Sequence, residues 1–230
     1  KGLKIINLKK NQGHARCNAL GLRFIIKNEN CDYVILMDGD GEDRPAELKI
    51  LVKKMEESKN VSVVAKRIKR SEGILFKFLY ELHKFITLIF TGQKIHFGNY
   101  SCLAFKDVEK ISSKPSLWSS FSGTLKKYIS PLEEINSIRG LRYFGPSQMS
   151  LFKLGIHSFA IMAVFKNTVY FRTIIILALL LGLQQFVDIY WVIISIFLVL
   201  FNFLIFVVSR RENLDELLLS EDNIDKINIL

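Results

Sequence analysis

Residues 33–48 read YVILMDGDGEDRPAEL, and this stretch decides the fold. Residues 33–37 form a continuous apolar run of strand length that stops at Asp38, which is typical of a strand buried on both faces. Pro45 stands at the start of the next helical pattern, and the first turn of a helix is a position that favours proline. A buried strand followed closely by a helix predicts an α/β domain.

Strand and helix patterns alternate around this stretch. Apolar residues at helical spacing predict helices at residues 13–27 and 45–58. The Ser-rich residues 112–130, which contain Pro115, are expected to form a loop. Short apolar runs predict further strands at residues 4–8, 61–65, 100–105 and 134–139, the last as an edge strand. The order strand, helix, strand, helix, strand predicts a mostly parallel sheet with helices on both faces.

The chain has 230 residues, 50% of them hydrophobic, and a formal net charge of +10. This length allows one soluble domain and a membrane module. A basic excess favours an anionic partner, such as a phosphate or a lipid headgroup. Nucleic acid is not expected, because the sequence contains no motif for binding it. Three cysteines (Cys17, Cys31 and Cys102) lack metal-ligand spacing and fit a reducing compartment.

Residues 173–208 are too long for one helix across a bilayer core of about 30 Å. Gly182 and the polar residues around Asp188 interrupt the apolar run. We therefore expect two transmembrane helices at about residues 169–187 and 189–208. Basic residues flank both ends of the pair, which predicts a hairpin with both ends in the cytoplasm. The alternative is a helical hairpin buried in a soluble core.

Two further apolar helices are predicted beside this pair. The helix at residues 72–91 contains Lys77 and Lys84 among its apolar residues, so it is either a core helix or a helix in the bilayer interface. Ser147 is expected to cap a helix that runs to about residue 162 and is amphipathic at first.

An acidic motif, Asp38-Gly39-Asp40, follows the buried strand. In an extended chain, side chains two residues apart point the same way, so both carboxylates can bind one hard cation. Open sheets bind ligands at the carboxyl ends of their strands, and Mg²⁺ or Mn²⁺ often joins a carboxylate to a diphosphate. Glu42 and Asp43 add negative charge. The alternative interpretation is an acidic turn that ends the strand.

The runs NLKKNQGHARCNALGL (7–22), YVILMDGDGEDRPAEL (33–48) and VVAKRIKR (63–70) resemble family 2 glycosyltransferases. They are most similar to the branch of dolichyl-phosphate mannose synthases and bacterial polyprenyl-phosphate glycosyltransferases. The resemblance covers residues 4–208 and implies a GT-A-like fold. It also implies sugar transfer from a nucleotide-sugar donor to a polyprenyl phosphate, at the cytoplasmic face of the cell membrane and with Mg²⁺ or Mn²⁺.

The resemblance implies roles for individual residues. Asp38 and Asp40 would hold the metal and the donor diphosphate, and Glu42 stands where the branch often has a Gln that reaches the metal. His14 lies in the turn before a helix, where the family often has a polar residue near the donor. A structural histidine is the alternative.

Basic residues match the family at two places. Arg67 and Arg70 match arginines that face the acceptor phosphate, although a solvated charge run is the alternative. Arg142 and Ser147 match an Arg and a Ser near the phosphates, although a loop with a helix cap would have the same sequence. The expected catalytic residues are Asp40, Arg67 and Arg70.

The chain departs from the family in two ways. Asn99 stands where many relatives have an acid, which favours an ionised phosphate acceptor that needs no base, or else indicates a weakened enzyme. Relatives begin with a strand, a nucleotide-binding loop and a second strand that bears an acidic residue, and none of these is found before Lys1. We therefore expect an N-terminally truncated chain that is inactive without the missing part.

These patterns together predict four regions. They are a partial catalytic domain (1–146), an amphipathic interface helix (147–167), two transmembrane helices (168–209) and a charged, peripheral cytoplasmic tail (210–230). Two alternatives remain for function: transfer to a saccharide or protein hydroxyl, and a non-catalytic membrane scaffold. The oligomeric state stays open, and a homo-oligomer is compatible with the sequence.

Overall fold

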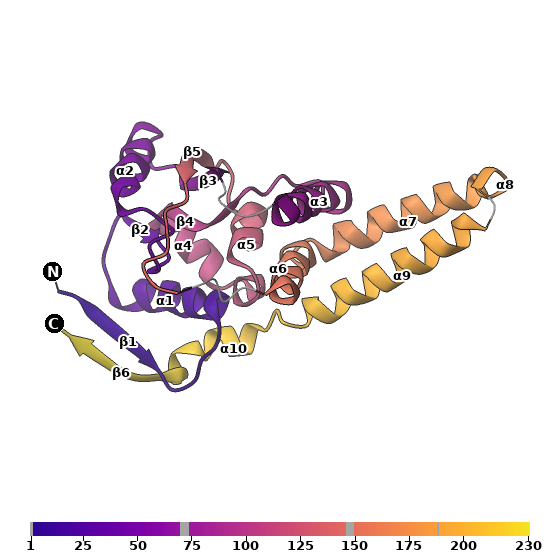
Figure 1. The fold of residues 1–230 in the computed structure, drawn as a ribbon. Coiled ribbons are helices and arrows are strands. Elements are labelled where there is room, and N and C mark those ends of the chain that lie inside the picture. Colours follow the sequence, from indigo (N-terminus) through magenta and orange to yellow (C-terminus); the bar gives the residue numbers. More distant parts are fainter. Residues whose placement is uncertain (1, 70–73, 146–149, 188) are drawn as a thin grey trace.

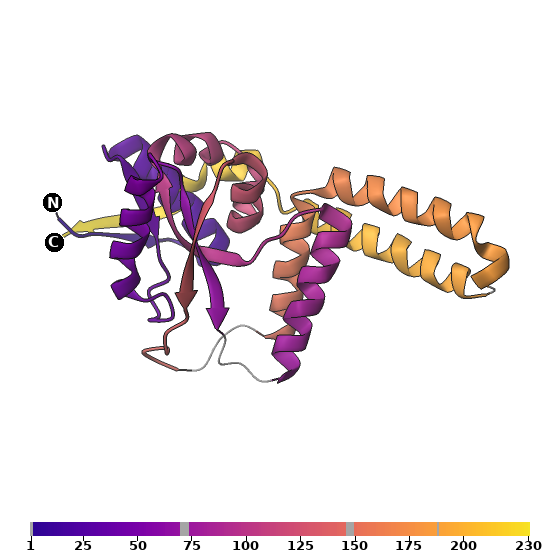
Figure 2. The same cartoon turned by 90° about the horizontal axis from the view of Figure 1, so that it is seen from above.

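The computed structural model describes residues 2–69, 74–145, 150–187 and 189–230. An α/β domain forms one end of the molecule, and a helical hairpin projects from it (Figure 1). Figure 2 shows the same hairpin from above, still pointing away from the sheet.

Within the described residues, the domain is built on a mixed four-stranded sheet. Its strands, in spatial order, are β2 (Tyr33–Leu36), β4 (Phe97–Ala104), β3 (Val63–Lys69) and β5 (Glu133–Ile138). β4 runs antiparallel to both β2 and β3, whereas β3 and β5 are parallel. β5 lies at an edge of this sheet, as predicted.

The prediction of a mostly parallel sheet is wrong at β4. A helix that packs on the sheet returns the chain to a parallel strand. The helix before β4 is α3 (Ile74–Thr91), and it packs mainly against helices of the hairpin region instead. The chain therefore enters the sheet from the opposite end.

Helices cover both faces of the sheet, as predicted. One face packs against α1 (His14–Asn28), α4 (Phe105–Ser112) and α5 (Phe121–Tyr128), and the other against η1 (Pro45–Glu47) and α2 (Leu48–Glu57). In β3, Val64 joins the first core, while Val63 and Ala65 join the second. This alternation arises because successive strand side chains point to opposite faces.

The Ser-rich segment at residues 112–130 is helical, so the prediction of a loop is wrong. It contains η2 (Pro115–Trp118) and α5 (Phe121–Tyr128). Ser120 caps α5 by accepting a hydrogen bond from the backbone N–H of Gly123, and Thr124 donates to Ser116 at 2.8 Å. Because these buried hydroxyls find hydrogen-bond partners within the segment, a polar sequence can enter the core.

The C-terminal segment differs from the predicted peripheral tail. In the described part of the chain, β1 (Lys4–Leu8) pairs antiparallel with β6 (Ile224–Ile229) rather than with the main sheet. Helix α10 (Leu214–Leu218) and η3 (Ser220–Asn223) precede β6. The side chain of Leu217 is fully buried in the main core. Nothing in the sequence indicated this burial, because Asp215 and Glu216 before Leu217 make the segment look solvent-exposed.

The hairpin consists of α7 (Lys166–Gly182), α8 (Gln184–Val187) and α9 (Tyr190–Ser209). Gly182 ends α7, in agreement with the predicted interruption. Among the described residues, one helical segment, Tyr190–Leu218, is long and apolar enough to cross a membrane. Phe197 and Phe203 are more than half exposed, so the hairpin is not buried inside this chain.

Helix α6 (Leu151–Ala163) meets α7 at an angle of 89°, and the two pass the length and apolarity test only together. Helices α6 and α7 could therefore form a second membrane span only together, as one bent segment. The predicted cap, Ser147, lies outside the described residues. Ser150 caps α6 instead, because its hydroxyl accepts a hydrogen bond from the backbone N–H of Lys153.

Helix α3 is not a core helix. Phe78 and Phe85 are 62% and 60% exposed, while Phe90 packs on Phe201 of α9 with ring centroids 4.5 Å apart. One face of α3 therefore contacts the hairpin, and its other face presents apolar side chains to the surroundings.

The burial of Leu217 leads to a stability prediction. Leu217→Ala should lower the free energy of unfolding by about 2–4 kcal/mol, because it leaves a cavity in the main core. Leu219→Ala, at a position that is 62% exposed, is the matched control and should cost under about 1 kcal/mol. Denaturant unfolding in detergent micelles measures both. Equal effects would contradict the packing of α10.

Candidate functional site

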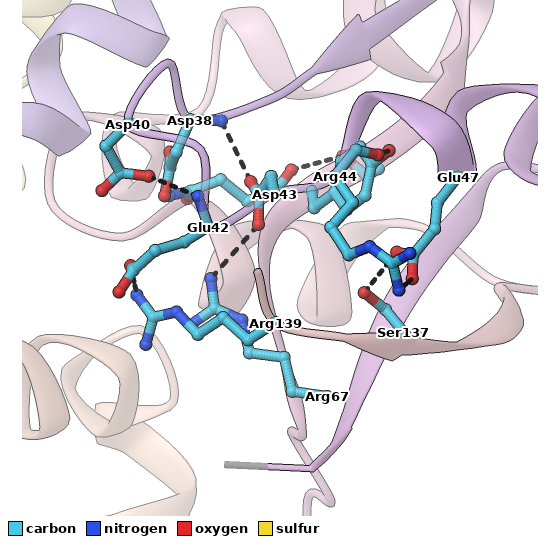
Figure 3. A network of polar contacts seen from close by, with 12 residues as sticks. Asp38, Asp40, Glu42, Asp43, Arg44, Glu47, Arg67, Ser137 and Arg139 are labelled. Atoms are coloured by element: carbon cyan, nitrogen blue, oxygen red, sulfur yellow. Dashed lines mark hydrogen bonds and ion pairs between the residues drawn. The ribbon is translucent and has the colours of Figure 1, made fainter. Parts of the chain in front are cut away.

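The acidic motif lies directly after β2, at the rim of the sheet (Figure 3). The loop turns back on itself: the backbone N–H of Asp38 donates to Asp43 Oδ2 at 3.0 Å, and that of Glu42 donates to Asp40 Oδ1 at 3.0 Å. Gly41 has a φ of +91°, which favours glycine. We call residues 38–43 the acidic loop.

The segment after β5 packs against the acidic loop. The backbone N–H groups of Gly140 and Tyr143 donate to the carbonyls of Glu42 and Asp40 at 2.8 and 2.9 Å. A Cβ atom at Gly41 would lie 2.8 Å from the ring of Tyr143. These contacts place Arg142, predicted from a separate motif, beside the acidic residues.

Arg142 and Arg139 neutralise two of the carboxylates. Arg142 Nη2 lies 2.9 Å from Asp40 Oδ2, and Arg142 Nε lies 3.2 Å from Glu42 Oε1. Arg139 also forms an ion pair with Glu42 (Figure 3). Arg139 was not expected from the sequence, and the signal that could have found it is its spacing of three residues from Arg142.

The buried Glu47 helps to place this arginine segment. Its carboxylate accepts hydrogen bonds from the hydroxyl of Ser137 at 2.6 Å and from the backbone N–H of Ile138 at 3.2 Å. Glu47 follows the acidic loop in the chain, and Ser137 and Ile138 end β5. The two segments therefore approach each other where Arg139 begins.

Asp38 has different partners from Asp40. Its Oδ1 accepts a hydrogen bond at 2.9 Å from the Nε2 of His14, which is the first residue of α1. The same oxygen lies 3.5 Å from the Nδ2 of Asn99 in β4. Burial opposes ionisation of Asp38, but the hydrogen bond and charge of His14, with the charge of Arg67, lower its pKa. The hydrogen bond to Asp38 in turn raises the pKa of His14.

Arg67 lies within the site rather than in a solvated charge run. Its Nη2 is 3.8 Å from Asp43 Oδ1, and its side chain is 16% exposed. Burial raises the pKa of Asp43, with only partial compensation from Arg67 and from the backbone N–H of Asp38. Arg70 and Ser147 lie outside the described residues.

Residues 1–111 match the family model described as Glycosyl transferase family 2. This part of the chain is therefore similar to glycosyl transferase family 2, and the match covers just under half of the chain. A comparison with curated proteins gives no match.

The residues that match the family model include His14, the acidic loop, Arg67 and Asn99, and the match ends within α4. Arg139 and Arg142 therefore come from outside it. The sheet also continues beyond the match, because β5 pairs with β3. The candidate site thus contains residues from the matched range and residues from the segment that follows it.

Glycosyl transferase family 2 commonly uses a divalent metal, so the side chains at this site can be compared with what a metal ion requires. Among the residues that the structure describes, no three side chains of metal-binding type converge. Mg²⁺ is usually held by one or two carboxylates together with substrate phosphates. Asp38 and Asp40 carry carboxylate oxygens of this type, and in this structure these oxygens contact His14 and Arg142 respectively. Glu42, held by two arginines, is the weaker candidate.

The two glycines of the acidic loop, Gly39 and Gly41, lead to a prediction. Gly41→Ala should destabilise the protein by about 1–3 kcal/mol, because φ is positive and the new Cβ would meet Tyr143. Gly39→Ala is the matched control, since a Cβ there meets nothing within 4 Å. Thermal unfolding compares the two variants, and a Gly39→Ala variant as unstable as Gly41→Ala would contradict this loop conformation.

The ion pair of His14 leads to a pH prediction in the absence of divalent metal. The imidazole should titrate above its ordinary pKa of about 6.5, and Asp38→Asn should return it towards that value. Because the pKa is raised on folding, the stability from this pair is complete below about pH 6.5 and is lost as the pH rises through the folded value. NMR titration of the assigned histidines measures the shift, and a His14 pKa at or below 6.5 would refute the pair.

Proposed function

We propose that this protein transfers a sugar from a nucleotide-sugar donor to a polyprenyl phosphate at the cytoplasmic face of a membrane, with Mg²⁺ or Mn²⁺. The observation that carries the proposal is the acidic loop with its arginines, in a chain that is similar to family 2 and continues into an apolar hairpin. The family match itself indicates sugar transfer and leaves the acceptor open.

The acidic loop supports the binding of a metal and the donor diphosphate. Asp38 and Asp40 would hold the metal, which would stabilise the departing nucleoside diphosphate as a Lewis acid. Arg142 bonds to the carboxylate of Asp40 in this structure. If Asp40 held a metal, the guanidinium of Arg142 would be available to bind two phosphate oxygens.

The polar groups around Asp38 support a phosphate acceptor. A hydroxyl acceptor needs a base within hydrogen-bond reach. Asn99 supplies an amide at this place, and the carboxylate of Asp38 is already paired with His14. A phosphate monoester is largely ionised at neutral pH, so it attacks without a base. Arg67, with Arg70, is proposed to attract that phosphate.

The base of the hairpin supports a two-crossing anchor. At its start, the carbonyl of Val164 accepts from Lys127 of the domain at 2.6 Å. At its end, Glu212 forms an ion pair with Lys166 at 3.4 Å. Both ends are thus held on the same side, so a chain that crosses in α9 must also cross back through α7.

The outer apolar surface supports contact with the bilayer interface. Phe78 and Phe85 of α3 and Phe152 of α6 are each at least 60% exposed. Lys84 of α3 pairs with Glu81 at 2.6 Å, so the helix also carries charged groups beside its apolar face, as interfacial helices do. We propose that α3 and α6 lie in the interface, close enough to the site to deliver a lipid phosphate.

Loss of one carboxylate tests the proposed chemistry. Asp40→Ala in the full-length protein should lower transfer to polyprenyl phosphate by about 100-fold or more, the scale seen when transition-state charge loses its stabilisation. A chelator should have the same effect. Glu57→Ala, which removes an exposed carboxylate of α2, is the matched control and should retain activity. The assay uses membranes, a panel of labelled nucleotide sugars and added polyprenyl phosphate.

The same assay separates the alternatives. A labelled saccharide or protein with no labelled lipid would favour a hydroxyl acceptor and contradict the polyprenyl phosphate proposal. Metal-dependent donor binding without any product would indicate a non-catalytic scaffold. A labelled lipid that forms equally well with Asp40→Ala would contradict the role of the acidic loop.

A further inference from the structure

The C-terminal segment makes polar contacts with α1 along the length of that helix. We call residues 213–229, which contain α10, η3 and β6, the C-terminal clamp. Three basic residues of α1 bond to it at 3.3, 3.3 and 2.7 Å. The pairs are Arg16 Nη2 with Glu216 Oε2, Arg23 Nη2 with the carbonyl of Leu218, and Lys27 Nζ with Glu221 Oε1. In Figure 1, α10 runs alongside α1.

Glu216 is the centre of these contacts. Besides Arg16, its Oε2 accepts a hydrogen bond from the indole N–H of the buried Trp118 at 2.7 Å. The guanidinium of Arg16 lies 5.0 Å from the centre of the same indole ring. Asn213 caps α10 and donates to Glu216 Oε1 at 3.1 Å. The position of α1 is therefore tied through one carboxylate to α10 and η2.

The clamp also holds the loop that enters α1. The backbone N–H of Lys9 donates to the carbonyl of Asn223 at 2.8 Å, and the side-chain amide of Asn223 donates to the carbonyl of Lys10 at 3.2 Å. The Nζ of Lys9 donates to the carbonyl of Asp222 at 2.8 Å. This loop ends at His14, which begins α1 and contacts Asp38.

We infer that the C-terminal clamp positions α1, and through it His14, against the acidic loop. Glu216 and Asn223 are then positioning residues for the sugar transfer proposed above, on which this role rests. The inner face of α1 packs through Ala19 and Leu22. Apolar contacts are not directional, so they allow small shifts along the helix axis. The directional bonds to the clamp set where the helix begins and therefore where the imidazole lies.

Hydrogen exchange tests the clamp without any assumption about the reaction. Glu216→Ala should speed amide exchange in the first turns of α1 by about threefold to tenfold, the scale of one lost polar contact at a partly exposed site. Asp215→Ala is the matched control, because it removes an exposed carboxylate of the same short helix. The fluorescence of Trp118, in a Trp191→Phe background, reports whether the clamp has changed at Trp118.

The two readouts together decide the outcome. A changed Trp118 emission with faster exchange in α1 supports the clamp. A changed emission with unaltered exchange in α1 would overturn it, as would equal exchange in the Glu216→Ala and Asp215→Ala variants. Asn223→Ala is a second variant that does not touch the core, and it should speed exchange at residues 9–14.

A double-mutant cycle tests whether the clamp acts through His14. In membranes that make the labelled lipid, Glu216→Ala should lower kcat/KM in the wild-type background and have little further effect in His14→Ala. Additive losses would mean that the clamp affects activity by another route and would overturn the positioning role. A complete absence of transfer in the wild type would count against the proposed function, while the exchange experiment would still decide the clamp.

Discussion

The structure of the site depends on the neutralisation of a crowded set of carboxylates. Asp38, Asp40, Glu42 and Asp43 lie within six residues, and side by side they would repel one another. Basic residues from three segments contact these carboxylates instead. His14 of α1 bonds to Asp38, and Arg67 of β3 lies beside Asp43. After β5, Arg139 pairs with Glu42, and Arg142 is shared between Asp40 and Glu42. Segments distant in sequence are thereby held at one edge of the sheet.

This arrangement also explains how the site could change on binding. The two ion pairs differ in exposure: the side chains of Asp43 and Arg67 are 4% and 16% exposed, whereas those of Asp40 and Arg142 are 31% and 26% exposed. The pair between Asp40 and Arg142 is the more accessible of the two, so under the function proposed above it is the pair that a divalent metal and a diphosphate would displace. The buried pair keeps the loop in place. The same loop can thus be rigid at Asp43 and exchangeable at Asp40.

Much of the secondary structure was predictable because apolar periodicity depends on local sequence. The strand at residues 33–36, the helices α1 and α2, and the break in the hairpin follow from runs of Val, Ile and Leu and from the positions of Gly and Pro. The strand predicted at residues 61–65 was found at residues 63–69, where it continues through basic residues. Two of the errors concern polar segments that become buried. In the Ser-rich segment, the hydroxyl of Thr124 donates to that of Ser116. Leu217 packs into the main core only after the hairpin has returned the chain.

The acidic motif, its place at the end of a strand and the apolar hairpin could be predicted because each depends on consecutive residues. His14, Arg67 and Arg142 were separate candidates in the sequence. The folded structure adds that these three converge on one loop and that Arg139 joins them. It also adds that β4 runs antiparallel and that the C-terminal segment lies along α1. The physical reason is that hydrogen bonds and ion pairs between distant segments depend on the path of the whole chain, which no local pattern encodes.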